Sequence, residues 1–159
     1  MNGEQKSYIA TINSSQPEEI FIKKTGWEEI VLPAHAHNKE QIIYTLSGTL
    51  RVQIGNTNYF VPEKHIAWIP AGVEHELCSH NRLVSLVIFY LSFEETDVMN
   101  GFSIYNTTSV IAENLKFIAS KGKLIRRDTQ ADLFQFTLSF FKLCLLYTSP
   151  SPRDRSVSR

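Results

Sequence analysis

Short apolar segments and turn residues alternate at regular spacing between Pro33 and Leu91, and this pattern restricts the fold more than any other feature of the chain. The apolar segments are QIIYTL, TLRVQI, YFV, HIAWI and LVSLVIFYL, and the turns between them are Ser47-Gly48, 55–58, 62–64 and 70–72. Short strands separated by Gly, Pro, Asn and Ser turns are typical of antiparallel sandwiches and barrels. The sequence therefore predicts a mainly β domain.

The N-terminal residues 7–32 also have a pattern that predicts strands. They contain the apolar pieces SYIATI, EEIFIK and TGWEEIVLP, separated by Ser/Pro and Thr-Gly steps. We expect two or three short strands here, because such steps interrupt regular structure.

Beyond residue 100 the apolar period changes to that of helices. Thr107 or Thr108 is suited to cap a helix whose apolar face is Ile111, Leu115 and Ile118. This helix should end near Lys121-Gly122. The basic residues that follow, up to Arg127, are expected to form a solvated loop between two helices.

A second helix is predicted from Thr129, with Asp132 three residues later as a variant of the capping box. Its main face is Leu133, Phe136, Phe140 and Leu143, but Phe134, Leu138 and Phe141 are also apolar. A helix that is apolar nearly all round must bury more than one side. Either another chain or a further part of the protein covers the second face, or the loops and the first helix do so.

The end of the chain has a different composition. Residues 144–154, CLLYTSPSPRD, resemble the translation of an adaptor sequence used in preparing sequencing libraries. We therefore expect residues 144–159 to be a non-native or disordered tail, and we exclude them from the fold prediction. The natural protein is then expected to continue past Leu143.

Charge argues against nucleic-acid binding by this segment. The chain has 16 basic and 16 acidic residues, and without the three arginines and one aspartate of the tail these fall to 13 and 15. DNA-binding domains usually carry a basic excess. The sequence also has no long apolar run, no signal-peptide pattern, and two distant cysteines that suggest no disulfide, so we expect a cytoplasmic protein without membrane contact.

Three histidines and one glutamine form the candidate chemical site. His35, His37 and Gln41 have the same parity, so on a strand their side chains would point to one face, and His75 would arrive from a later strand. Three imidazoles and an oxygen donor are suited to a divalent transition metal such as Fe, Mn, Ni, Cu or Zn.

The alternative is that these groups line a small-molecule pocket without metal, with Trp68 and Tyr44 as aromatic walls. We assign no catalytic residue. His65 and His80 are expected to be ordinary surface residues.

Two segments resemble the motifs of the cupin superfamily. HAHNKEQIIYTLSG, from His35 to Gly48, is similar to the first cupin motif, and WIPAGVEHEL, from Trp68 to Leu77, to the second. The resemblance implies a double-stranded β-helix or jelly-roll barrel in which His35, His37 and His75 take the positions of metal-ligating histidines.

The sequence departs from the cupin motifs at three positions. Gln41 stands in place of the usual glutamate, Lys64 in place of a glycine, and Ser79 in place of an asparagine. A neutral amide would hold a dication less tightly than a carboxylate, and it cannot serve as a general base.

The whole stretch from the HAH motif to Leu143 resembles the N-terminal effector-binding and dimerisation domain of AraC-type transcription regulators. The resemblance implies a barrel at 1–100 that binds a small-molecule effector, and a helical pair at 101–143 that forms a homodimer through Leu133, Phe136 and Phe140. It also implies that DNA is bound only by a separate helix-turn-helix half, which is missing here. The alternative is a stand-alone metal-dependent cupin enzyme, of the dioxygenase or isomerase type, with a three-histidine, one-glutamine site.

Overall fold

The computed structural model describes residues 1–94 and 101–146. Its strands are β1 (Glu19–Lys24), β2 (Val31–His35), β3 (Glu40–Ile54), β4 (Thr57–Pro62), β5 (His65–Ile69), β6 (His75–Leu91), β7 (Ser103–Asn106) and β8 (Leu124–Arg126). Its helices are α1 (Gly3–Asn13), α2 (Ser109–Ala119) and α3 (Ala131–Phe141), which continues into the π-helical segment η2 (Lys142–Leu146). The fold is mainly β, as the sequence predicts.

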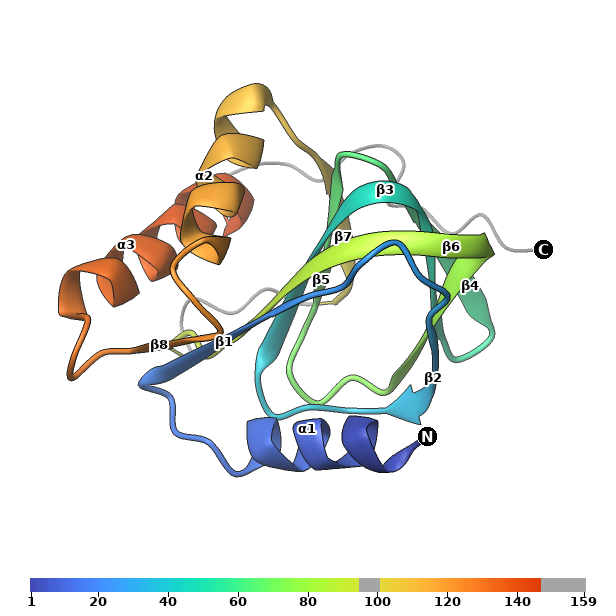
Figure 1. Cartoon of the computed structure of the whole chain (residues 1–159), viewed down its shortest axis with the longest axis horizontal. Coiled ribbons are helices and arrows are strands. Elements are labelled where there is room, and N and C mark those ends of the chain that lie inside the picture. The colour runs from blue at the N-terminus through green and yellow to red at the C-terminus, as the bar shows by residue number, and fades with distance from the viewer. Residues whose placement is uncertain (95–100, 147–159) are drawn as a thin grey trace.

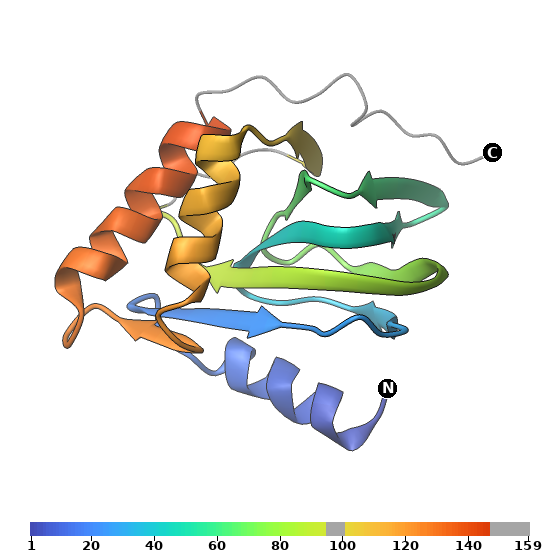
Figure 2. The same ribbon diagram turned by 45° about the horizontal axis from the view of Figure 1, so that its top comes forward.

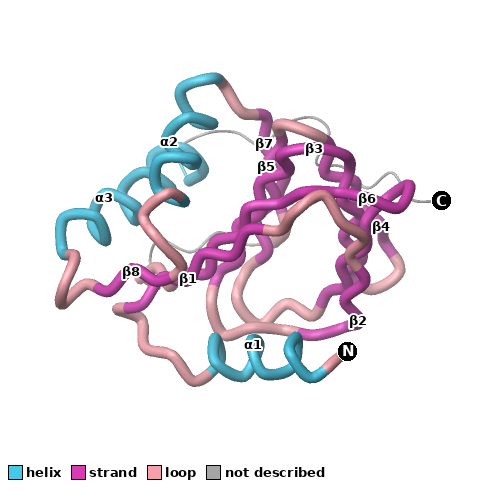
Figure 3. The backbone as a smooth tube through the Cα atoms, in the orientation of Figure 1, coloured by secondary structure: helices cyan, strands magenta, loops and turns pink. Residues whose placement is uncertain are grey.

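The strands form one antiparallel sheet that curls into a barrel (Figures 1 and 3). Six strands follow the order β7-β5-β3-β6-β1-β8, while β2 pairs with β6 and β4 pairs with β3. Figure 2 shows α2 and α3 together beside one end of the barrel, and α1 on a different side, along β1. No helix among the described residues is long and apolar enough to cross a membrane.

The long strands β3 and β6 are apolar on both faces because both faces are buried. Side chains at 86, 88 and 90 belong to a cluster inside the barrel, while those at 87, 89 and 91 belong to a cluster that packs against α2 and α3. On β3, Ile42 belongs to the cluster on the helix side and Ile43 to the cluster inside the barrel. An unbroken apolar run such as LVIFYL is what a strand between two hydrophobic layers requires.

Ser47 and Gly48 do not form the predicted turn. They lie inside β3, where the pairing with β6 shifts register on both sides of Gly48. Gly48 has φ of +82°, and a Cβ atom there would lie 2.7 Å from the carbonyl oxygen of Leu83. Glycine is therefore needed for a bulge that bends the sheet, and not for a hairpin.

The segment SYIATI is helical, so the strand predicted there is wrong. It lies in α1, which begins with a capping box in which Asn2 and Gln5 bond each other's backbone N–H groups. The prediction considered only the short apolar pattern and missed this helix-start signal. The strand predicted from EEIFIK is confirmed as β1.

The C-terminal helices follow the prediction with two differences. Thr108 caps α2, and Leu115 and Ile118 are buried, as expected. In α3, however, Thr129 is not the cap; Gln130 occupies that position and makes no side-chain capping bond. The helical segment also extends beyond Leu143 to residue 146, and Leu145 is buried in the core. The rest of the predicted tail, 147–159, lies outside the described residues.

The basic residues between the helices are partly paired with acidic ones. Nη2 of Arg126 lies 3.3 Å from Oε2 of Glu19, and Nη2 of Arg127 lies 3.3 Å from Oε2 of Glu18. These contacts connect β8 to the start of β1. The solvated loop predicted here is therefore wrong in part, because Leu124–Arg126 form β8, which pairs with β1 and buries Ile125.

Candidate functional site

Three histidines meet inside the barrel from three places in the chain. His35 ends β2, His37 lies in the connection to β3, and His75 begins β6. All three are buried, and their ring centroids lie 4.4–5.4 Å apart. Each ring offers a nitrogen atom such that the three atoms lie within 4.8 Å of one another. We refer to these residues as the histidine trio.

The elements that carry these histidines differ from those predicted. His35, His37 and Gln41 do not share one strand, because β2 ends at His35 and β3 begins only at Glu40. His37 is held in the connection, where its carbonyl oxygen accepts a 2.7 Å hydrogen bond from the N–H of Gly72. The turn at 70–72 therefore positions His37.

Backbone carbonyl groups fix the orientation of two of the rings. Nδ1 of His35 lies 2.7 Å from the oxygen of Pro33, and Nδ1 of His75 lies 2.9 Å from the oxygen of Val73. Since a carbonyl oxygen can only accept, each Nδ1 carries a proton and each Nε2 keeps its lone pair. Nε2 of His75 is buried with no hydrogen-bond partner. Imidazoles that are oriented in this way are typical metal ligands, so the trio could hold a metal ion.

The trio is neutral at physiological pH. Burial lowers the pKa of His37 to about 3, with a further contribution from the neighbouring His35 and His75. Burial also lowers the pKa of His75 to about 4, against the opposing effect of its bond to Val73. The pKa of His35 is lowered for the same reason. Neutral imidazole is the form that binds metals or accepts hydrogen bonds.

Gln41 is connected to the histidine trio through Tyr90. Its Nε2 atom donates a 3.4 Å hydrogen bond to the hydroxyl of Tyr90, whose ring lies 5.1 Å from that of His37. The other amide atom of Gln41, Oε1, is buried without a partner. Gln41 thus has an acceptor with no partner among the described residues, and it is connected to the trio through Tyr90.

The two predicted aromatic walls lie elsewhere. Trp68 and Tyr44 belong to the cluster on the helix side of the sheet, and neither lines the cavity described below. Nε1 of Trp68 donates a 2.6 Å hydrogen bond to Glu40. Of the remaining histidines, His80 is exposed as expected, but His65 is buried at the start of β5. His65 is therefore not the surface residue that we expected.

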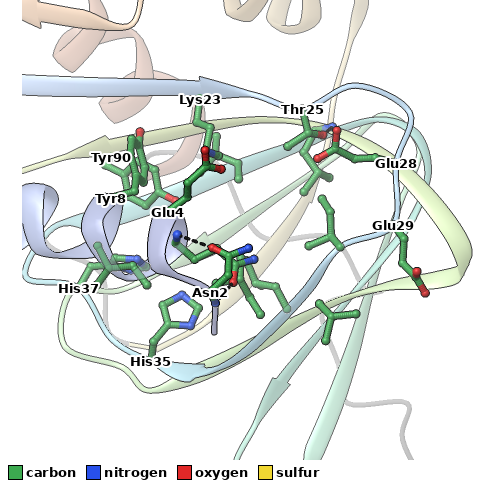
Figure 4. A pocket seen from close by; sticks show the side chains of 18 residues that line it. Asn2, Glu4, Tyr8, Lys23, Thr25, Glu28, Glu29, His35, His37 and Tyr90 are labelled. Carbon is green, nitrogen blue, oxygen red and sulfur yellow. Dashed lines mark hydrogen bonds between the residues drawn. The ribbon is translucent and has the colours of Figure 1, made fainter.

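A cavity of about 310 Å³ extends from His35 and His37 along the inside of the barrel. Helix α1 covers it, and the side chains of Tyr8 and Ile9 form part of its wall. Figure 4 shows Tyr8, Tyr90, His37 and His35 gathered toward one end of the cavity and Thr25, Glu28 and Glu29 toward the other. Because the strand prediction for residues 7–12 was wrong, sequence reasoning missed the whole contribution of α1.

Two buried charged residues hold the connection that carries His37. Nζ of Lys39 donates to the backbone oxygens of Gln16 and Glu19 at 2.7 and 3.0 Å. The carboxylate of Glu40 accepts hydrogen bonds from Trp68 and from the N–H of Ala71. Sequence reasoning gave neither residue a role, because two adjacent charges at a strand end resemble an exposed loop.

Comparison with known proteins identifies relatives of this domain. Residues 17–107 match the family described as the AraC-like ligand-binding domain. Among curated proteins, the HTH-type transcriptional regulator NimR of Escherichia coli (strain K12) is 38% identical over 55 residues. That match covers 35% of this chain and 20% of the regulator, so the chain matches only a small part of its relative.

The fold is similar to that of solved ToxT structures from Vibrio cholerae. An apo ToxT structure has a TM-score of 0.57 with 9% identity, covering 83% of this chain and 56% of ToxT. The ToxT structure from strain O395 has a TM-score of 0.53 with 10% identity, covering 85% and 57%. At this level of identity the likeness supports the fold alone.

Proposed function

The chain belongs to the family of AraC-like ligand-binding domains, and we propose that it binds a small organic effector in the cavity under α1. In this proposal the domain is the sensing part of a longer transcription regulator. DNA is then contacted by a separate helix-turn-helix half, since the 16 basic and 16 acidic residues of this chain leave no basic excess.

The cavity is the observation that carries the proposal. Its wall includes the buried apolar side chains of Ile30, Leu86 and Ile88, with His35, His37 and Tyr90 as its buried polar groups. An apolar cavity of this size with a few convergent polar groups is typical of small-molecule sites. Residues of helix α1 add a further wall to the cavity, which favours a bound molecule over a contact with a flat surface.

Filling the cavity should abolish effector binding. Ile30→Phe would place additional ring atoms in the cavity, whereas Val110→Phe enlarges an apolar residue that is 70% exposed on α2. We expect compounds from a fragment library that raise the melting temperature of the wild-type chain to raise that of the Val110→Phe variant equally, and to have no effect on a folded Ile30→Phe variant. Fragments that stabilise both variants alike would place the site elsewhere.

We also propose that the histidine trio binds a divalent transition metal. Three neutral imidazoles fit such an ion, and the unpartnered Oε1 of Gln41 would be the fourth donor. The ion would supply a Lewis-acidic position for a donor atom of the effector. Gln41 cannot act as a base, and the carboxylate of Glu40 is engaged by Trp68 and Ala71. These two residues therefore favour binding over metal-dependent catalysis.

Metal binding should persist at unusually low pH. Protons compete with the metal only as pH falls through the histidine pKa values, and those of His37 and His75 are about 3 and about 4. We expect calorimetric titration with Zn²⁺ to give one ion per chain, with an affinity that falls by less than about tenfold from pH 7.5 to pH 5.5, because His37 and His75 stay neutral and the pKa of His35 is lowered by burial. A site made of three histidines with unshifted pKa values would bind Zn²⁺ about a thousandfold more weakly at pH 5.5 than at pH 7.5.

The same titration identifies the ligands. His75→Ala should abolish the binding seen with the wild-type chain, whereas His80→Ala, which changes an exposed histidine, should leave it intact. Binding that survives His75→Ala would exclude the trio as the metal site.

A dimer through α2 and α3 is the third part of the proposal. Phe117 is 49% exposed, Phe136 39% and Leu143 65%, and the rings of Phe117 and Phe136 are 6.2 Å apart. These residues form an apolar surface across the two helices, with Leu133 half-buried and Phe140 buried at its inner side. Such a surface is more typical of an interface than of a monomer exterior.

Polar substitution of this surface should weaken association. We expect the double variant Phe117→Ser, Phe136→Ser to sediment as a monomer at concentrations at which the wild-type chain is a dimer. Phe140 is left unchanged because its burial would make the change destabilising. Val31→Ser, at an exposed apolar residue of β2, serves as the control and should leave the dimer intact. An unchanged association state in the double variant would contradict the interface.

A further inference from the structure

The contacts around α1 narrow the chemical class of the effector, on the premise of the proposed function. We infer that the cavity, when no metal ion is bound to the histidine trio, selects an uncharged molecule with a hydrogen-bond acceptor, and that Tyr8 of α1 is the residue that recognises this acceptor. Tyr8 lies outside both motif segments found in the sequence.

Tyr8 is held at the histidine end of the cavity by its ring. The ring makes an edge contact with Tyr90 at a centroid distance of 5.7 Å, and Nζ of Lys23 lies 4.5 Å from its centroid. Tyr90 in turn contacts the ring of His37 at 5.1 Å. The three aromatic side chains thus form one continuous wall, which Figure 4 shows from close by.

The hydroxyl of Tyr8 has no hydrogen-bond partner in the part of the chain that the structure describes. It is buried, and no hydrogen bond to it is formed from any described residue. Burial raises the pKa of Tyr8 to about 12, so this hydroxyl stays protonated and can donate. A buried hydroxyl without a partner costs stability, and a ligand acceptor would recover that cost.

The charges around the cavity disfavour an anion. Glu4, Glu28 and Glu29 line the cavity, and all three are exposed; Figure 4 shows Glu4 near Tyr8 and the other two at the opposite end. Among the described lining residues Lys23 is the only lysine or arginine, and it already lies over the ring of Tyr8. A carboxylate moved to the tyrosine end would lose its hydration, and its one cationic partner would be the exposed Lys23, which faces a lining that also carries three glutamates. An uncharged carbonyl group would accept from Tyr8 without that cost.

The volume limits the size of the molecule. At the packing density of protein interiors, a cavity of about 310 Å³ holds roughly 230 Å³ of ligand van der Waals volume. One or two fused rings with a short polar substituent fit this space. The rings of Tyr8, Tyr90 and His37 meet edge to face at one end of the cavity, and such ring edges and faces favour contact with an aromatic ligand.

Matched pairs of neutral and anionic probes test the inference. The probes are benzamide and benzoate, naphthamide and naphthoate, and indole carboxamide and indole carboxylate, titrated calorimetrically into the full chain in EDTA. EDTA is included because a metal ion on the trio would itself attract a carboxylate. We expect at least one carboxamide to bind, and its carboxylate partner to bind at least about tenfold more weakly.

Two variants separate recognition by Tyr8 from general packing. Tyr8→Phe keeps the ring contacts and removes only the hydroxyl, so it should weaken carboxamide binding about tenfold. Tyr59→Phe removes the hydroxyl of a half-buried tyrosine outside the cavity lining and should have no effect.

The outcomes distinguish this inference from the proposed function. If a carboxylate binds as tightly as its carboxamide, or if Tyr8→Phe changes nothing, the inference is wrong. In either case the cavity remains the effector site provided that Ile30→Phe still abolishes binding. If no probe of the panel binds, both the inference and the proposed function lose their support.

Discussion

The antiparallel pairing of β3 with β6 is the constraint on which the rest of the domain depends. The two strands are in register from Glu40 opposite Leu91 to Thr45 opposite Leu86, and again beyond the bulge at Gly48. Because side chains alternate along a strand, this pairing sends one set into the barrel and the other toward the helices. The cavity and the helical surface are therefore built on opposite faces of the same strands. A slip of one residue would exchange the two sets.

This arrangement gives a short physical path between the cavity and the apolar surface of α2 and α3. On β6, Leu86 and Ile88 line the cavity, while Phe89 contacts Phe141 of α3 at a ring distance of 5.1 Å. A molecule that shifts β6 by its contacts in the cavity would act on the packing of α3. We propose this strand as the element that couples the two sites, with a coupling free energy of about 1–3 kcal/mol, as in other allosteric proteins.

Much of the fold was predictable from the sequence because turns and apolar strands are local signals. The Gly55 hairpin, β5, and the helix capped by Thr108 follow from such signals. The bulge at Gly48 was not predictable, since the close approach to Leu83 exists only after β6 has paired. The helix α1 was missed although its capping box is visible in the sequence.

The site was predictable only in part, because some of its residues come from elements or strand faces that the sequence alone does not reveal. The spacing of His35 and His37 and the arrival of His75 suggested a cluster, and these residues do meet. The tyrosines at the same end were not anticipated, because Tyr8 comes from the unrecognised helix and Tyr90 from an apolar run whose two faces the sequence alone does not distinguish. Among the described residues, the buried polar atoms that have no hydrogen-bond partner include Oη of Tyr8, Oε1 of Gln41 and Nε2 of His75. Such atoms are expected where a protein keeps groups available for a ligand.

Methyl NMR of the isoleucine side chains tests most directly whether the barrel cavity is the binding site. Ile30 and Ile88 line the cavity, whereas Ile66 and Ile118 belong to the helix-side cluster. On addition of the tightest-binding probe, the account predicts intermolecular nuclear Overhauser effects from the probe to the methyl groups of Ile30 and Ile88. Such effects to Ile66 or Ile118, with none to the cavity residues, would contradict it.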